Sequence, residues 1–284
     1  MPDARVERFD APDGTKLGYH ILGDGPPVVC VPGGPGRASV YLEDLAGLSD
    51  THSLVKFDLR GTGISELPAD RDSLAFPRLA EDVELLREQR NLDRMDLLGH
   101  SAGCIVAMTY AARHPERISR LVLVTPSAHL FGDVSDDLEA IRRSRSGESW
   151  YPDAAAAQAE LELLPPHRRN RPTPELRMFA YGRWDERCQE HAASTDSQMS
   201  LRATAAFGAG ADFDVDALRT GLSKLTAPVL VVVGGRDGLT GVRAGYLVAD
   251  LMPNSRVVEI PAAGHFPWVD EPEQFRSALG DFLD

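Results

Sequence analysis

A serine stands between two glycines in the pentapeptide GHSAG, residues 99–103, and its hydroxyl is the first candidate for chemistry in this sequence. The spacing G-x-S-x-G is that of a nucleophile elbow, a strained strand-to-helix turn that lifts a serine hydroxyl above the edge of a sheet. An apolar run, MDLL, precedes the motif, and a helical pattern, CIVAMTYAARHP, follows it. Gly99 and Gly103 are expected where the backbones come too close for a β-carbon. Ser101 is therefore predicted to be a nucleophile and not merely a polar residue in a turn.

A serine hydroxyl needs a base to take its proton, so one of the eight histidines must lie beside it. His265 follows a glycine in the loop between the last predicted strand and the last predicted helix. Loops at the carboxyl ends of parallel strands gather at one edge of a sheet, where Ser101 also lies. His100 adjoins Ser101, but its side chain is expected to point away across the turn. His265 is the predicted base.

A carboxylate must hold the imidazole of such a base in the correct tautomer. Asp237 lies in a turn directly after the apolar run VLVVV, and it gives the chain order serine, acid, histidine that accompanies this type of elbow. The rival acids Asp212, Asp214 and Asp216 precede a helical pattern, and they are expected to cap that helix. Asp237 is the predicted acid.

The glycine-rich segment VCVPGGPGRA, residues 29–38, follows an apolar run and can present backbone N–H groups. Two such donors stabilise the oxyanion that forms when a nucleophile attacks a carbonyl, and each is worth about 3 kcal/mol. We expect the N–H of Gly34 to act with that of Ala102, and Gly33 is the alternative to Gly34.

Short apolar runs separated by helical patterns must position these groups, and they predict an α/β fold. We expect a mostly parallel sheet covered by helices on both faces, with an N-terminal hairpin feeding the first buried strand. The predicted buried strand is 28–31, and further short apolar strands are predicted at 54–57, 95–98, 121–124, 229–233 and 257–260. The predicted helices are 76–89, 105–114 and 272–282.

The strand pattern disappears between residues 127 and 211, where alanine, arginine, glutamate and proline dominate. This stretch is interpreted as an inserted helical cap, interrupted by a proline-rich loop. The segments 1–126 and 212–284 are predicted to form the core domain.

Composition excludes several classes of function. A net charge of −13 disfavours nucleic acid and anionic membrane surfaces as partners, and it favours a neutral or cationic small molecule. The first ten residues contain no apolar signal region, and no run reaches the roughly 20 apolar residues that span a bilayer. The scattered cysteines Cys30, Cys104 and Cys188 fit a reducing compartment. The sequence predicts a cytoplasmic protein without a metal or organic cofactor. It does not predict the oligomeric state.

Together these motifs resemble the α/β-hydrolase fold, and several resemble its proline iminopeptidase branch. The segment PGGPG, residues 32–36, is similar to the His-Gly-Gly-Pro-Gly loop of that branch, and FDLRGTGIS, residues 57–65, to its Asp-x-Arg-Gly-x-Gly-x-Ser segment. The resemblance covers about residues 5–126 and 212–284. It implies a catalytic triad of Ser101, Asp237 and His265, and a cap over the pocket.

The same branch binds the free α-amine of its substrate through acids of the cap. The segment GRWDERC places Trp184 and Asp185 in a comparable pattern and makes them candidate substrate-binding residues, with Glu186 as the other possible anchor. The sequence departs from the branch at Pro32, where histidine is usual, and at Ala102, where tryptophan is usual.

The sequence therefore predicts a serine hydrolase that cleaves an ester or amide of a small molecule through an acyl-enzyme. Two alternatives stay open. One is a biosynthetic tailoring enzyme that uses the same chemistry for acyl transfer, cyclisation or carbon–carbon cleavage, and the other is a ligand-binding protein on a hydrolase scaffold. No catalytic role can be assigned to Asp58 or Arg60 from the sequence, and the two residues are expected to form a buried structural pair.

Overall fold

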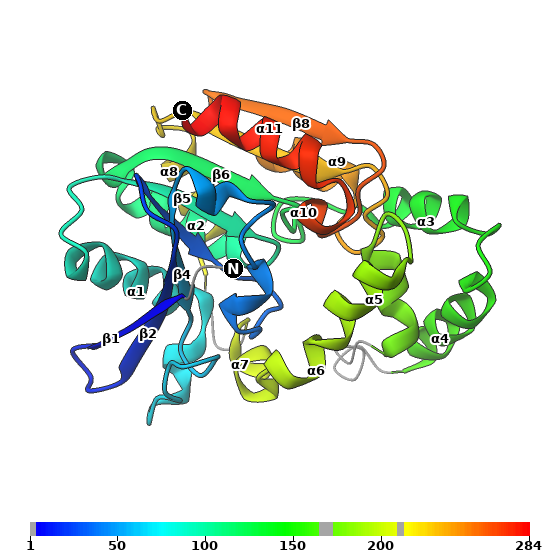
Figure 1. Ribbon diagram of the computed structural model, residues 1–284, viewed down its shortest axis with the longest axis horizontal. Coiled ribbons are helices and arrows are strands. Elements are labelled where there is room, and N and C mark those ends of the chain that lie inside the picture. Colours follow the sequence, from blue (N-terminus) through cyan, green and yellow to red (C-terminus); the bar gives the residue numbers. More distant parts are fainter. Residues whose placement is uncertain (1–3, 165–172, 209–212) are drawn as a thin grey trace.

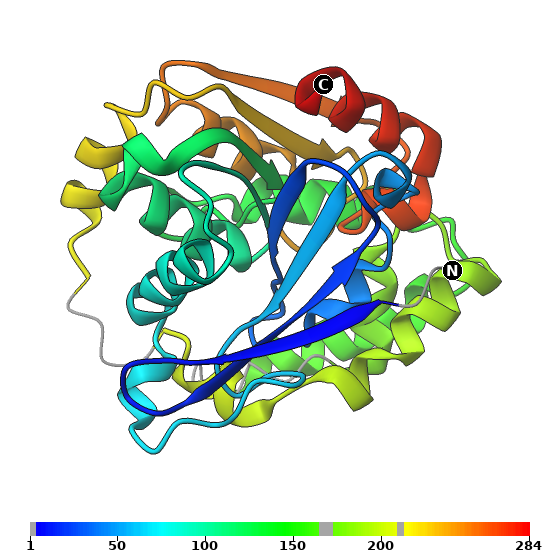
Figure 2. The same cartoon turned by 60° about the vertical axis from the view of Figure 1, so that its left-hand side comes forward.

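The structure is a computed structural model that describes residues 4–164, 173–208 and 213–284. Within these residues, eight strands form one sheet in the order β1-β2-β4-β3-β5-β6-β7-β8 (Figure 1). Their bounds are β1 Arg5–Asp10, β2 Lys16–Leu22, β3 Pro27–Val31, β4 Ser53–Asp58, β5 Met95–His100, β6 Ile118–Val124, β7 Val229–Gly234 and β8 Ser255–Ile260. β2 pairs antiparallel with β1 and β4, and the other pairs are parallel. The predicted mostly parallel sheet is confirmed, and Figure 2 shows β1 and β8 at its opposite edges.

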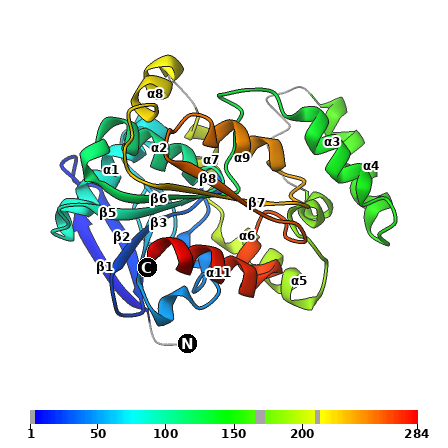
Figure 3. The ribbon, with the colours of Figure 1, turned by 90° about the horizontal axis from the view of Figure 1, so that it is seen from above.

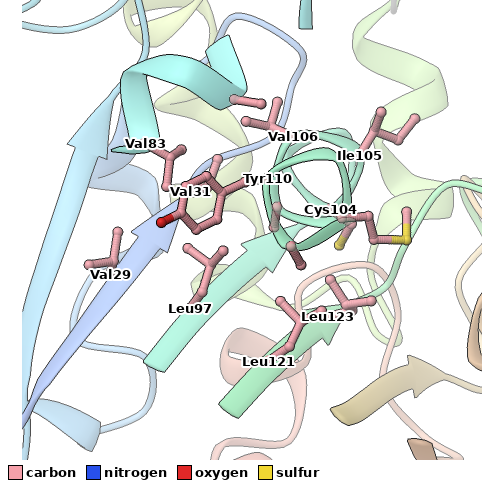
Figure 4. Packing of buried hydrophobic residues seen from close by; sticks show 14 of the residues in the cluster. Val29, Val31, Val83, Leu97, Cys104, Ile105, Val106, Tyr110, Leu121 and Leu123 are labelled. Atoms are coloured by element: carbon pink, nitrogen blue, oxygen red, sulfur yellow. The ribbon is translucent and has the colours of Figure 1, made fainter. Parts of the chain in front are cut away.

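Helices cover both faces of this sheet, as predicted (Figure 3). α1 Phe76–Gln89, α2 Gly103–Arg113, α8 Val215–Leu222 and α9 Val242–Ala249 pack on one face, and α11 Pro272–Leu283 packs on the other. Successive strand residues point to opposite faces, so Val29 and Leu97 pack against α1 and α2 (Figure 4). Val28 and Leu98 belong to the other cluster, to which α11 contributes. No helix in the described ranges is long and apolar enough to cross a membrane.

Between β6 and α8, the described residues form helices joined by turns and loops, and they contain no strand beyond one isolated bridge between Arg37 and Met199. It forms α3 Ser135–Ser144, α4 Tyr151–Leu163, the 3₁₀ helix Pro174–Ala180, α5 Glu186–Ala193, α6 Thr195–Gln198 and α7 Leu201–Ala206. These helices lie to one side of the sheet (Figure 1). The predicted boundary at 211 and 212 and the predicted proline-rich loop at 165–172 lie outside the described residues, and the division into core and cap domains stays a prediction.

Asp58, at the end of β4, joins three segments of the core. Its fully buried carboxylate accepts the backbone N–H of Ser39 at 2.6 Å and that of Ile64 at 2.9 Å, and it contacts His20 Nε2 at 3.2 Å. A β-carbon on Gly63 would lie 2.0 Å from Asp58 Oδ2, so the glycine at this position lets the loop close over the carboxylate.

The expected pairing of Asp58 with Arg60 is wrong. Because β4 ends at Asp58, Arg60 lies in the following turn, and its guanidinium reaches Asp82 on α1 at 2.6 Å and Asp13 beside the N-terminal hairpin. The segment FDLRGTGIS is therefore a structural junction between the first strands and α1.

Replacing Asp58 with asparagine is expected to lower the free energy of unfolding by about 3 kcal/mol at pH 7, because an amide cannot accept all three donors. Burial raises the pKa of Asp58, but the hydrogen bonds from His20 and from the Ile64 and Ser39 N–H groups outweigh it, so that the pKa lies below 3.8. A lowered pKa stabilises the fold above the unfolded value, and this contribution is lost as the pH falls through the folded value.

Urea unfolding between pH 7 and pH 3 measures both effects. The difference between wild type and Asp58→Asn should stay constant down to about pH 4 and shrink below it. The exposed Asp281→Asn variant is the control, with a change within about 0.5 kcal/mol. A pH-independent difference for Asp58→Asn would contradict the role of the ionised carboxylate.

Candidate active site

Ser101 lies in the turn between β5 and α2 with a φ of +54°, a strained conformation for a residue with a side chain. A β-carbon on Gly99 would lie 2.9 Å from Cys104 Cα, and one on Gly103 would lie 2.5 Å from the carbonyl oxygen of Pro32. Both glycines are therefore required by close backbone contacts. A close contact between α2 and β5 was expected at Gly103. Its close contact is instead with Val31 and Pro32 at the end of β3.

His265 follows β8, and its ring contacts the predicted acid. Its Nδ1 lies 2.8 Å from Asp237 Oδ2. Burial raises the pKa of Asp237, but the charge and hydrogen bond of His265, with Thr240 and the Leu239 N–H, hold that pKa below its usual value. The ionised carboxylate accepts the Nδ1 proton, so the tautomer that leaves Nε2 as an acceptor is favoured.

The backbone of His265 is fixed on both sides. Its N–H donates to the Ala180 carbonyl at 2.6 Å, and its own carbonyl accepts from Thr125 Oγ1 at 3.0 Å and from His100 Nε2 at 2.9 Å. His100 Nδ1 in turn accepts from the Tyr41 hydroxyl at 2.6 Å. Burial and the nearby His265 charge lower the pKa of His100 well below its usual value, so its ring is neutral.

Sequence reasoning missed this part of the site. Only the adjacency of His100 to Ser101 drew attention to it, and no local pattern indicates that its ring supports the His265 loop. No sequence pattern around Tyr41 indicated that it belongs to the site either.

The glycine-rich loop after β3 lies directly against the elbow. A β-carbon on Gly33 would be 2.8 Å from Ser101 Cβ and 3.2 Å from Ala102 N. The N–H of Gly33 donates to the Tyr41 hydroxyl at 2.7 Å, which makes Gly33 a poor oxyanion donor. Gly34 lines the cavity described next, as does Ala102 at the positive N-terminal end of α2.

A cavity of about 570 Å³ lies between the predicted site residues and the helices between β6 and α8. Ser101, His265, Gly34 and Ala102 line it. Its remaining wall is largely apolar, and the chain between β6 and α8 contributes Leu161, Leu176, Phe179, Met199 and Phe207. The structure thus brings the predicted nucleophile and base to one cavity, with Asp237 buried behind the base.

The charges in this cavity differ from those of the whole chain. No aspartate or glutamate occurs among its described lining residues, which include Arg37, Arg142 and Arg177. The preference for a neutral or cationic ligand that the net charge suggested is therefore not supported, because the acidic side chains lie elsewhere.

Trp184 and Asp185 are not among the residues that line the cavity. Asp185 caps α5 by accepting the Cys188 N–H at 3.0 Å, and it pairs with Arg183 at 2.6 Å on the surface. Trp184 packs against Tyr181 with ring centroids 5.4 Å apart. The acid of this pattern is therefore a helix cap. Its position does not support the predicted role in binding a substrate amine, and the exposed Glu186 lines no part of the cavity either.

The described residues contain no group of three or more histidine, cysteine or acidic side chains that could hold a metal ion. Cys30, Cys104 and Cys188 are free and buried.

Comparison with known proteins places this geometry in a family. The model of the alpha/beta hydrolase fold family matches residues 26–272. A proline iminopeptidase from Heyndrickxia coagulans is 26% identical over 271 residues, 92% of each chain. An N-formylmaleamate deformylase from Pseudomonas putida is 30% identical over 274 residues, 92% of this chain and 90% of the relative. The solved structure of a proline iminopeptidase from Mycobacterium smegmatis has a TM-score of 0.76 at 20% identity, covering 99% of this chain and 97% of that one, a likeness of fold. The chain therefore belongs to the α/β-hydrolase fold family and resembles its proline iminopeptidase branch.

Proposed function

We propose that this protein is a serine hydrolase that cleaves an ester or amide of a small molecule through an acyl-enzyme. The observation that carries the proposal is the 2.8 Å contact between His265 Nδ1 and the buried Asp237, at a cavity that His265 shares with Ser101. The membership of the family and the relatives named above support hydrolysis.

Each residue has one role in the proposed mechanism. Ser101 Oγ attacks the acyl carbonyl while His265 Nε2 takes its proton, and Asp237 stabilises the imidazolium. The N–H groups of Gly34 and Ala102 donate to the oxyanion of the tetrahedral intermediate. His265 then gives the proton to the leaving group. A water molecule activated by His265 attacks the acyl-enzyme and releases the acid.

The lining of the cavity argues against an aminopeptidase. A substrate with a free α-amine needs a carboxylate partner, and the described lining residues offer none. We propose an ester or a non-peptide amide as the substrate. The free cysteines fit a cytoplasmic location, which we retain as part of the proposal.

A fluorophosphonate probe, which reacts with activated serines, tests the nucleophile. We expect one phosphonyl group per chain in the intact mass, and peptide mapping should locate it on Ser101. The heat-denatured protein is the control and should remain unlabelled, because reactivity depends on the folded His265–Asp237 pair.

Labelling should abolish the cleavage of short-chain 4-nitrophenyl esters in parallel with probe incorporation. Modification of another residue would overturn the assignment of Ser101. Absence of both labelling and turnover would favour a ligand-binding protein, and turnover of prolyl arylamides would restore the aminopeptidase alternative.

A further inference from the structure

Arg37 is a buried cation in the wall of the proposed active site. Its side chain follows the glycine-rich loop, lines the same cavity as Ser101, and is only 4% exposed. Its Nε donates to Gln198 Oε1 at 2.8 Å, and its Nη2 donates to Ser194 Oγ at 3.0 Å and to the His191 carbonyl at 3.3 Å. The guanidinium also lies 4.3 Å from the centroid of the Tyr41 ring. All of these partners are electrically neutral.

No carboxylate in the described part of the chain forms an ion pair with Arg37, although 43 acidic residues occur in the sequence. Its Nη1 has no hydrogen-bond partner among the described residues, and this atom is not sealed off from solvent. Burial lowers the pKa of Arg37, but a guanidinium remains charged at neutral pH. A buried charge without a counter-ion is costly, so the site suits an anion.

A second arginine extends the same positive region. Arg142 on α3 lines the cavity and donates from Nε to the Gly238 carbonyl at 2.8 Å, and no described carboxylate pairs with it. Arg177 differs, because Asp196 neutralises it. The cavity therefore holds two cations that form no ion pair with a described carboxylate, inside a protein whose net charge is −13.

We propose that the substrate of this enzyme carries a carboxylate, which Arg37 binds while the ester or amide carbonyl lies at Ser101. The inference rests on the proposed hydrolase function and names its substrate class: monoesters or monoamides of dicarboxylic acids. A carboxylate matches the free Nη1 edge of Arg37 because a planar guanidinium and a planar carboxylate form charge-assisted hydrogen bonds. The apolar wall of the cavity receives the rest of the molecule.

The test compares two substrates that differ at one end. Mono-4-nitrophenyl glutarate ends in a carboxylate, and 4-nitrophenyl pentanoate ends in a methyl group. We expect wild type to prefer the glutarate ester at least tenfold in kcat/KM. Arg37→Gln should lower that selectivity to about one, through KM more than kcat. Because both esters are measured on the same variant, a general loss of activity lowers both kcat/KM values and leaves their ratio unchanged.

Arg117→Gln is the matched control, because Arg117 lies on the surface beside Asp93 and outside the cavity. It should keep the wild-type ratio. Thermal unfolding identifies a variant that fails to fold, and Arg37→Lys then serves in its place, since lysine retains the charge without the planar fork and should keep part of the selectivity.

A binding measurement separates this inference from the proposed function. Isothermal titration with glutarate and with pentanoate requires no turnover, and we expect wild type to bind glutarate at least tenfold more tightly. Arg37-dependent glutarate binding without ester cleavage would retain the anion site and overturn the hydrolase. Ester cleavage with a selectivity or glutarate affinity that Arg37→Gln leaves unchanged would overturn the anion site alone.

Discussion

Replacing Ser101 with alanine is expected to lower kcat/KM for a reactive ester by about 10⁴- to 10⁶-fold. Without the hydroxyl no acyl-enzyme forms, and the remaining turnover comes from binding and from the oxyanion donors. The strained φ of +54° at this position is already adopted by Ser101, and alanine has the same β-carbon, so the fold should tolerate the change. Initial rates of 4-nitrophenol release at several ester concentrations measure the effect.

Ser223→Ala is a matched control for this experiment. Ser223 lies at the end of α8, where its hydroxyl donates to the Thr220 carbonyl at 2.9 Å, and it is not among the residues that line the cavity. Its rates should equal those of wild type. If Ser101→Ala kept a rate within tenfold of wild type while the control behaved as expected, another nucleophile or a directly activated water would have to perform the reaction.

The fold was predictable because its signals are local. The predicted helix 76–89 coincides with α1, since Pro77 stands in its first turn and Leu79, Val83 and Leu86 repeat along one face. The strands β3 to β8 follow from short apolar runs, and β5 and α2 directly flank the GHSAG turn. Each of these elements spans at most 14 consecutive residues.

Contacts between distant segments could not be read in this way. Arg60 pairs with Asp13 and Asp82 and not with its neighbour Asp58, because the turn after β4 decides which carboxylates it meets. The hydrogen bond from the Gly33 N–H to the Tyr41 hydroxyl was likewise not predictable, because it depends on how the loop after β3 folds.

The positive charge of the cavity could not be predicted either, because it depends on residues that are distant in the sequence. Arg37 and Arg142 are more than 100 residues apart in the sequence, and only the fold brings the loop after β3 and helix α3 to the cavity that contains Ser101. A net charge sums over the whole surface and carries no information about which side chains line one cavity. Asp185 of the GRWDERC pattern was expected to bind a substrate amine, and in the structure it caps α5. An aspartate before a helix caps that helix whether or not a substrate is near, so the pattern alone does not identify a binding residue.

Replacing Asp237 with asparagine is expected to lower kcat by about 10⁴-fold near neutral pH. The N–H groups of Leu239 and Thr240 donate to Oδ1 at 2.8 and 3.2 Å, so the amide oxygen of the variant is held at that position. Its NH₂ group must then replace Oδ2 and donate to His265 Nδ1. This hydrogen bond favours the wrong tautomer, with the proton on Nε2, and His265 can no longer accept the proton of Ser101.

The rate is compared where Asp237 is ionised, and thermal unfolding of the variant distinguishes the tautomer effect from a general loss of structure. Because the pKa of Asp237 lies below its usual value of 3.8, the wild-type carboxylate stays ionised above about pH 4, so protonation of Asp237 does not contribute to the rates at pH 7 to 8, where the loss for Asp237→Asn should be measured. The exposed Asp250→Asn variant, at the end of α9, should match wild type over the same range. A kcat for Asp237→Asn within tenfold of wild type would mean that His265 keeps its tautomer without this carboxylate, and the acid of the site would then have to be sought elsewhere.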